Sequence, residues 1–123
     1  MPKKTVEAST PPGRLNDPPL LILTSLAAGE KHGYALMQDI ASFAGVHLGP
    51  GTLYGAISRL EERGLIEAVG ETERRRPYRL TATGSAALEA ALADLRAIVD
   101  EGAARLAQRK VRRRPSLALQ VAQ

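Results

Sequence analysis

The stretch that decides the fold is Gly49-Pro-Gly-Thr-Leu-Tyr-Gly-Ala-Ile-Ser-Arg-Leu-Glu-Glu-Arg-Gly-Leu-Ile66, near the middle of the 123-residue chain. Gly49 can cap a helix, and Pro50 suits its first position because a missing N–H costs nothing there. Apolar residues recur at i, i+4 and i+7 and predict one buried stripe, formed by Leu53, Ile57 and Leu60. Gly64 can adopt the left-handed conformation that ends a helix. The stretch therefore predicts a helix from Pro50 to just before Gly64, followed by an extended segment.

The opposite face of this helix carries small residues, hydroxyl-bearing residues and one basic residue. It carries Gly51, Thr52, Gly55, Ser58 and Arg59, with Tyr54 on its flank. Such a face lets a helix come close to another surface, as a helix that enters the DNA major groove must. On these residues alone, an ordinary surface helix is an equal alternative.

Two more helices are expected before this one. The first begins at Pro18-Pro19, with Asn16 or Asp17 as its cap, and is apolar on nearly every side. It is therefore expected to be buried on more than one face, partly by another subunit, with Leu20 and Leu23 at a dimer interface. The second runs from Gly33 to Ala44 and stops at Gly45. Two short helices, a tight connector and a third helix form the helix-turn-helix pattern.

After Gly64 the pattern becomes that of a β-hairpin. Residues 65–69 and 77–81 are predicted strands, joined by a polar tip that contains Arg74, Arg75 and Arg76. A basic tip at this point matches the wing of a winged helix-turn-helix. A solvated loop is the alternative, and Glu71 and Glu73 offset part of the local charge.

A last helix is expected from the cap at Thr81 or Thr83 to about Arg109. Its apolar positions are spaced by four and three residues in turn, which is the seam of a helix that packs along another helix: Leu88, Leu92, Leu95, Val99, Gly102 and Leu106. The seam predicts dimerisation, although packing on the helix's own domain is the alternative. Gly102 is expected to bend or loosen the helix. Residues 110–123 are expected to form a basic flexible tail, and residues 1–15 a disordered arm.

Composition excludes several classes of protein. The chain has no Cys, which removes disulfides and thiol chemistry and fits the cytoplasm. Its two histidines, His32 and His47, lack the spacing of a metal motif, and no apolar run approaches the ~20 residues of a membrane span. The net charge of +4 comes from the termini, because residues 15–80 hold seven basic and eight acidic residues. Charge evidence for DNA binding must therefore be local.

Four blocks of the sequence resemble the PadR family of bacterial transcriptional regulators. They are His32-Gly-Tyr-Ala-Leu36, Gly51-Thr-Leu-Tyr54, Arg59-Leu-Glu-Glu-Arg-Gly-Leu-Ile66 and Arg75-Arg-Pro-Tyr-Arg-Leu-Thr81-x-x-Gly84, in the family's order over residues 17–107. The resemblance implies a mainly α fold with a small β-hairpin: a winged helix-turn-helix over residues 16–80 and a dimerisation helix over residues 81–109. With one helix after the wing, the chain is similar to the short subfamily. The family often has Pro where this chain has Gly55. Because the chain has no Trp, the tryptophan-lined drug pocket of some short members does not carry over.

The combined prediction is a homodimer that binds an inverted repeat in double-stranded DNA and acts as a repressor relieved by a signal or an unspecified small molecule. Three residues are expected at or near base edges: Thr52, Ser58 and Arg59. Tyr34 and Tyr54 are expected to bind phosphates or to act as partly buried supports. The wing arginines are expected to hold the DNA backbone or the minor groove: Arg74, Arg75 and Arg76. No cofactor, metal or membrane is expected. No catalytic group is expected either, because no nucleophile–base grouping is present. The alternative is a non-enzymatic protein-interaction module with the same dimeric fold.

Overall fold

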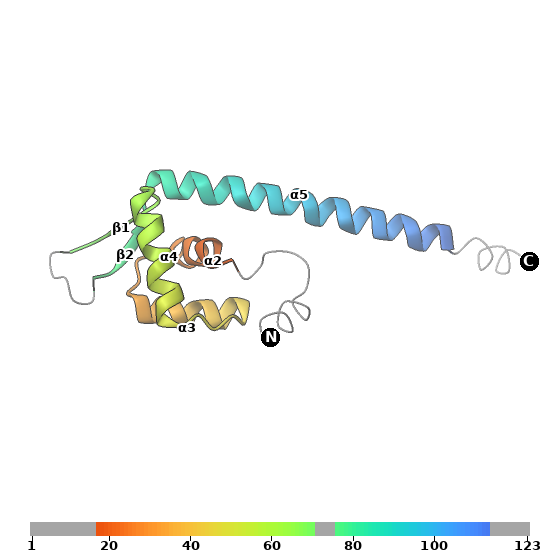
Figure 1. Cartoon of the computed structure of the whole chain (residues 1–123). Helices are drawn as coiled ribbons and strands as arrows, with labels where there is room; N and C mark the ends of the chain where they lie inside the picture. The colour runs from red at the N-terminus through yellow and green to blue at the C-terminus, as the bar shows by residue number, and fades with distance from the viewer. Residues whose placement is uncertain (1–16, 71–75, 114–123) are drawn as a thin grey trace, which may run out of the picture. The chain divides into compact units, whose positions relative to one another are not determined.

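The computed structural model describes residues 17–70 and 76–113. In chain order these form helices α2 (Pro18–Leu26), α3 (Gly33–Ala44) and α4 (Pro50–Glu62), strands β1 (Ile66–Ala68) and β2 (Tyr78–Leu80), and helix α5 (Ala82–Arg113), as Figure 1 shows. This is the mainly helical chain with one hairpin that the sequence predicts. The chain divides into two compact units, one ending at Leu88 and the other beginning at Glu89. The predicted arm over residues 1–15 lies outside the described residues.

The glycines end the helices where the sequence predicts. Gly49 is the N-cap of α4 in an extended conformation, and Pro50 follows as its first residue. Gly45 caps the C-terminus of α3 with a φ of 69°, and Gly64 follows α4 with a φ of 75°. Residues with a side chain rarely adopt such positive φ angles, so the glycines fix both helix ends.

The core of the first unit is aliphatic and draws on every helix and on the hairpin. The predicted stripe of α4 is fully buried in it, with Ala56 beside it. The core consists of Leu21, Ile22, Leu23, Leu26, Leu36, Ile40, Leu53, Ala56, Ile57, Leu60, Leu65, Ile66 and Leu88. Leu23 and Leu88, which were expected at a dimer interface, are each only 6% exposed. They are therefore covered within one chain, and this corrects the expectation for both.

The hairpin is short and gains a third segment. β1 and β2 are antiparallel, with Glu67 opposite Arg79, and each has three residues rather than the five expected. Lys31, in the connection between α2 and α3, pairs with Tyr78 through two backbone bonds, N–H to O=C at 3.1 Å and 2.9 Å. The connection before α3 is thus tied to the base of the wing.

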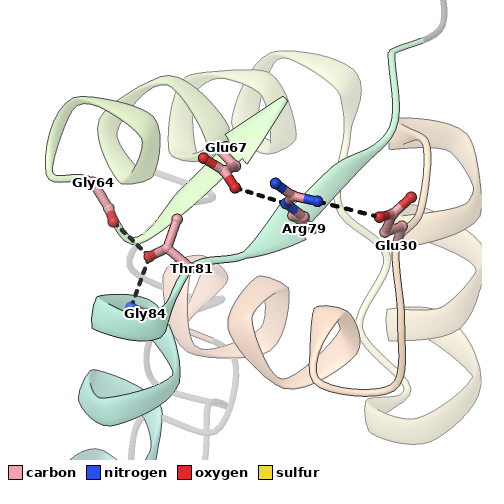
Figure 2. A network of polar contacts seen from close by, with 6 residues as sticks. All are labelled: Glu30, Gly64, Glu67, Arg79, Thr81 and Gly84. Carbon is pink, nitrogen blue, oxygen red and sulfur yellow. Dashed lines mark hydrogen bonds and ion pairs between the residues drawn. The ribbon is translucent and has the colours of Figure 1, made fainter. Parts of the chain in front are cut away.

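Thr81 joins the hairpin to α5. Its Oγ1 donates to the Gly64 carbonyl at 2.6 Å and accepts from the Gly84 N–H at 3.0 Å, as Figure 2 shows. The second bond is the N-cap bond of α5, because Gly84 is the third helical residue. A Cβ atom on Gly84 would lie 2.8 Å from the carbonyl carbon of Leu65 and closer still to its oxygen. This position therefore has room only for glycine.

Helix α5 is longer than the sequence suggests. It continues through Gly102 and ends at Arg113, so residues 110–113, which were expected to belong to the flexible tail, are helical instead. Basic residues in the last turn stabilise the helix because they face the partial negative charge of its C-terminus.

Candidate nucleic-acid interface

The predicted face of α4 lies on the outside of the first unit. Its members, called the α4 face, are exposed except for the partly covered Gly55: Gly51, Thr52, Tyr54, Gly55, Ser58 and Arg59. A Cβ atom on Gly55 would lie 3.6 Å from Arg59 Nη1, so the guanidinium group lies beside the backbone of Gly55. The α4 face thus combines a nearly bare backbone with one exposed cation, and a helix of this kind can approach base edges closely.

The N-terminus of α4 adds unpaired backbone donors. Gly49 makes no side-chain capping bond and Pro50 has no N–H, while the Leu53 N–H is already bonded to the Gly49 carbonyl. The N–H groups of Gly51 and Thr52 precede the first helical bond. They can therefore bind an anion such as a phosphate, which the helix dipole also favours.

Tyr54 is held against the start of α3. A Cβ atom on Gly33 would lie 2.7 Å from the Tyr54 Cζ atom, so the phenol ring rests on the bare backbone of Gly33. Tyr54 keeps about half of its surface exposed. It is therefore a support between α3 and α4, with its hydroxyl oxygen as the atom nearest to the Gly33 backbone. The sequence pattern does not reveal this contact of Gly33, because it joins residues 21 positions apart.

Tyr34 is more exposed, at 66%, and is also oriented by a neighbour. Gln38 donates from Nε2 to the Tyr34 phenol oxygen at 3.2 Å. Because that oxygen is accepting, the hydroxyl proton remains free to donate to a phosphate. Gln38 is not among the predicted site residues, although its i, i+4 spacing from Tyr34 on a helix was the available signal.

The wing is described only at its base. Arg74 and Arg75, two of the three predicted wing arginines, lie outside the described residues. Arg76 is partly covered, and its Nε is shielded from solvent with no hydrogen-bond partner in the described part of the chain. Burial raises the pKa of the Tyr78 hydroxyl, and the Glu61 carboxylate raises it further, whereas Arg76 opposes this shift. Arg76 therefore lies near Tyr78 rather than projecting wholly into solvent.

The remaining cations near the hairpin are engaged by acids. Arg79 Nε donates to Glu67 Oε2 across the strands at 2.6 Å, and its Nη1 lies 4.0 Å from Glu30 Oε2 (Figure 2). The hydrogen bond to Glu67 raises the pKa of Arg79. Lys31 Nζ donates to the Ser25 carbonyl at 2.6 Å and lies 3.9 Å from Asp39 Oδ2. Both cations are thus used to hold the fold, and Arg59 remains the cation of the α4 face.

The predicted dimer residues differ in exposure. Leu20 is half-buried and packs on the core, as Leu23 and Leu88 do more completely. The other four members lie on α5 in the second unit. Leu95 is half-buried, whereas three are exposed: Leu92, Val99 and Leu106. Exposed apolar side chains in a row on one helix are typical of an interaction surface.

The described residues contain neither a cluster of metal ligands nor a membrane-spanning helix. Within residues 17–70 and 76–113, no three His, Cys, Asp or Glu side chains gather so that they could hold a metal ion. His32 and His47 are both exposed. In the same ranges, no helix is both long and apolar enough to cross a membrane.

Helices α2 and α3 and a connector precede α4, and a hairpin follows it. This arrangement is a winged helix-turn-helix, a class of DNA-binding protein. Residues 22–90 match the PadR-like family of transcriptional regulators. The chain belongs to this family, which confirms the resemblance seen in its sequence. Members are transcriptional regulators that bind DNA and are not enzymes.

Solved structures and relatives agree with this assignment. A PadR family transcription regulator from Clostridium difficile R20291 is 27% identical, with a TM-score of 0.61 over 72% of this chain and 93% of that one. A PadR family regulator from Eggerthella lenta is 28% identical, with a TM-score of 0.61 over 72% of this chain and 80% of that one. The Mycobacterium tuberculosis transcriptional regulator Rv3488 is 42% identical over 72 residues, 56% of this chain and 66% of the relative. An uncharacterised 37.1 kDa protein of a Streptomyces fradiae transposon is 46% identical over 76 residues, 62% of this chain but only 22% of the relative.

Proposed function

We propose that the chain is a homodimeric repressor that acts in the cytoplasm and recognises an inverted repeat in double-stranded DNA. The observation that carries the proposal is the α4 face, which is exposed, nearly bare of large side chains and basic at Arg59. Thr52, Ser58 and Arg59 would contact base edges, whereas Tyr34 and Tyr54 would donate to phosphates. Arg74, Arg75 and Arg76 of the wing would hold the backbone or the minor groove.

A dimer is supported by the exposed apolar residues of α5. Two copies related by a two-fold axis would present two α4 helices to successive major grooves, roughly 34 Å or one helical turn apart. A signal or a small molecule would relieve repression by changing the separation of these helices. The coupling would act through α5, which joins the wing to the proposed dimer surface.

The test is selection of bound duplexes from a random-sequence pool. We expect an enriched inverted repeat whose half-sites are centred about 10–10.5 base pairs apart. Arg59→Ala should cost ~1–3 kcal/mol on the selected duplex and relax the base preference at one position of each half-site. Arg63→Ala is the matched control, because it removes an equal charge four residues later, at the C-cap that follows α4. It should weaken all duplexes alike and leave the base preference intact.

Two results would contradict the proposal. Enrichment of no sequence would remove specific recognition and would favour the protein-interaction module. An unchanged base preference after Arg59→Ala would remove that residue from the reading set. The direction of regulation follows from transcription in vitro on a promoter that carries the selected site, where a repressor lowers the amount of transcript and an activator raises it.

A further inference from the structure

The last third of α5 is strongly basic. From Gly102 to Arg113 the helix holds five basic side chains and no acidic one: Arg105, Arg109, Lys110, Arg112 and Arg113. All five are exposed, and the helix runs through them without a break, as Figure 1 shows. We call the last four of these residues, from Arg109 to Arg113, the basic end.

The basic end has no acidic partner on its own helix. Side chains pair along a helix when three or four residues separate them. Arg105 makes such a pair with Glu101, from Nε to Oε2 at 2.7 Å. Glu101 is the last acidic residue of the sequence and lies eight positions before Arg109. The helix dipole favours cations in the last turn but does not neutralise them, so the charge of the basic end is available to an anion outside the helix.

The winged helix-turn-helix carries little net charge of its own. Residues 15–80 hold seven basic and eight acidic residues, so their formal net charge is −1. Two of the basic residues, Lys31 and Arg79, already contact acids. Proteins gain much of their affinity for DNA when their cations replace the counterions of the phosphates. This sequence-independent contribution therefore calls for cations from another part of the chain.

We infer that the basic end binds the phosphate backbone of DNA beside the operator, without reading its sequence. This inference rests on the proposed DNA recognition by α4 and adds a second contact to it. Three of the four side chains are arginines, whose planar guanidinium groups bind phosphate oxygens through two parallel hydrogen bonds. The 32 residues of α5 make a helix about 48 Å long. Because successive major grooves are about 34 Å apart, the far end of such a helix can reach DNA that α4 does not contact.

The other side of the helix argues against a membrane as the partner. Basic helices that lie on membranes carry Trp, Phe or Leu opposite their cations. At 3.6 residues per turn, the face opposite the basic end carries only small apolar residues: Ala104, Ala107 and Val111. These side chains offer little apolar area to insert among lipids. DNA is the polyanion that fits, because the chain belongs to a family of transcriptional regulators.

Neutralising the basic end tests the inference in the full-length chain. The test variant carries Arg109→Gln, Lys110→Gln, Arg112→Gln and Arg113→Gln. Glutamine has nearly the same helix propensity as arginine and lysine, so α5 should persist. The matched control keeps every charge and carries Arg109→Lys, Arg112→Lys and Arg113→Lys. Arg96→Gln is the control for position, because it removes an exposed cation of α5 outside the basic end.

Anisotropy compares two duplexes that carry the selected operator. The short duplex ends at the operator, and the long one has random flanks of about 15 base pairs on each side, or roughly 50 Å at 3.4 Å per pair. Each phosphate contact contributes about 0.9 to the slope of log K against log salt concentration. The loss of four contacts should lower the slope on the long duplex by about 3.6. A fourfold rise in salt then costs the natural chain about 150-fold more affinity than the test variant.

On the short duplex, the natural chain and the test variant should bind with equal affinity, which also shows that the variant is folded. Both controls should match the natural chain on both duplexes. Equal slopes for the natural chain and the test variant on the long duplex would overturn the inference. An equal drop on both duplexes would place the contact within the operator and would also overturn it. A lower slope for either control would mean that the charge of the basic end is not the cause.

Two further comparisons separate the ways of being wrong. If the natural chain prefers the short duplex to a scrambled one but the slopes on the long duplex are equal, the inference fails and recognition by α4 stands. If it shows no such preference, the proposed function fails and the inference falls with it. Vesicles of phosphatidylglycerol and phosphatidylcholine test the membrane. Sedimentation of the natural chain with them, but not of the test variant, together with unchanged slopes on DNA, would assign the basic end to a lipid surface instead.

Discussion

Gly84→Ala should destabilise the first unit strongly for a change of one methyl group. The added Cβ atom would lie 2.8 Å from the carbonyl carbon of Leu65, and its nearest neighbours are all backbone atoms of that residue. No side chain can swing aside, so either the start of α5 or the segment at Leu65 must shift. That shift would also strain two bonds at Thr81, from its N–H to the Leu65 carbonyl at 3.1 Å and from its Oγ1 to the Gly64 carbonyl at 2.6 Å.

The size of the effect follows from two opposing contributions. Overpacking costs about 1–3 kcal/mol, and backbone obstacles place this site at the upper end of that range. Alanine in a helix recovers about 1 kcal/mol relative to glycine. The net loss should be about 2 kcal/mol in the free energy of unfolding. For a chain of this size, that lowers the Tm by about 8 °C.

The assay is thermal unfolding followed by circular dichroism, at one fixed protein concentration because association shifts the Tm. Gly55→Ala is the matched control, since its Cβ atom would meet only Arg59 Nη1, at the ordinary distance of 3.6 Å. It should raise the free energy of unfolding by up to ~1 kcal/mol. A Gly84→Ala protein as stable as the natural chain would refute the close packing of α5 on Leu65.

Three further predictions concern the first unit. Gly33→Ala should displace the Tyr54 ring and weaken DNA binding about as much as Tyr54→Ala does, and the double variant should bind like either single one, as anisotropy would show. The natural chain should lose stability more steeply than Tyr78→Phe as the pH rises above 10. Because the pKa of Tyr78 is raised in the folded protein, the stabilisation linked to its neutral hydroxyl is complete below the ordinary pKa of 10.0. This stabilisation is lost as the hydroxyl ionises at higher pH. Asp39→Ala should cost ~1–3 kcal/mol in urea unfolding, because the buried Ser25 Oγ, which donates to Asp39 Oδ2 at 2.6 Å, then loses its partner.

Local chemistry made the helix ends predictable. Gly45, Gly49 and Gly64 act on their own neighbours in the chain, so their roles can be read from the sequence without knowing the fold. The α4 stripe was equally clear, because Leu53, Ile57 and Leu60 repeat with the period of one helix. The exposure of the α4 face follows directly from that stripe.

Contacts between distant residues could not be predicted. The seam spacing assigned Leu88 to a partner helix, but the period of a helix does not reveal which surface covers it, and here the chain's own core does. Gly84 occurs in a recognisable motif, although its need for a bare backbone depends on Leu65, 19 positions earlier. The end of α5 was not predictable for another reason: a run of basic residues is typical of a flexible tail, but the same charges stabilise a helix C-terminus.

Specific DNA recognition through α4 is tested most directly by anisotropy with the selected duplex and a scrambled duplex of the same composition. Titrations at 50 and 200 mM salt separate phosphate contacts from base contacts. With 6–10 phosphate contacts, affinity for the selected duplex should fall by about 10³–10⁵ between these salt concentrations. At each salt concentration the selected duplex should bind at least ~10³ times more tightly than the scrambled one. Equal affinity for the two duplexes at both salt concentrations would contradict the account.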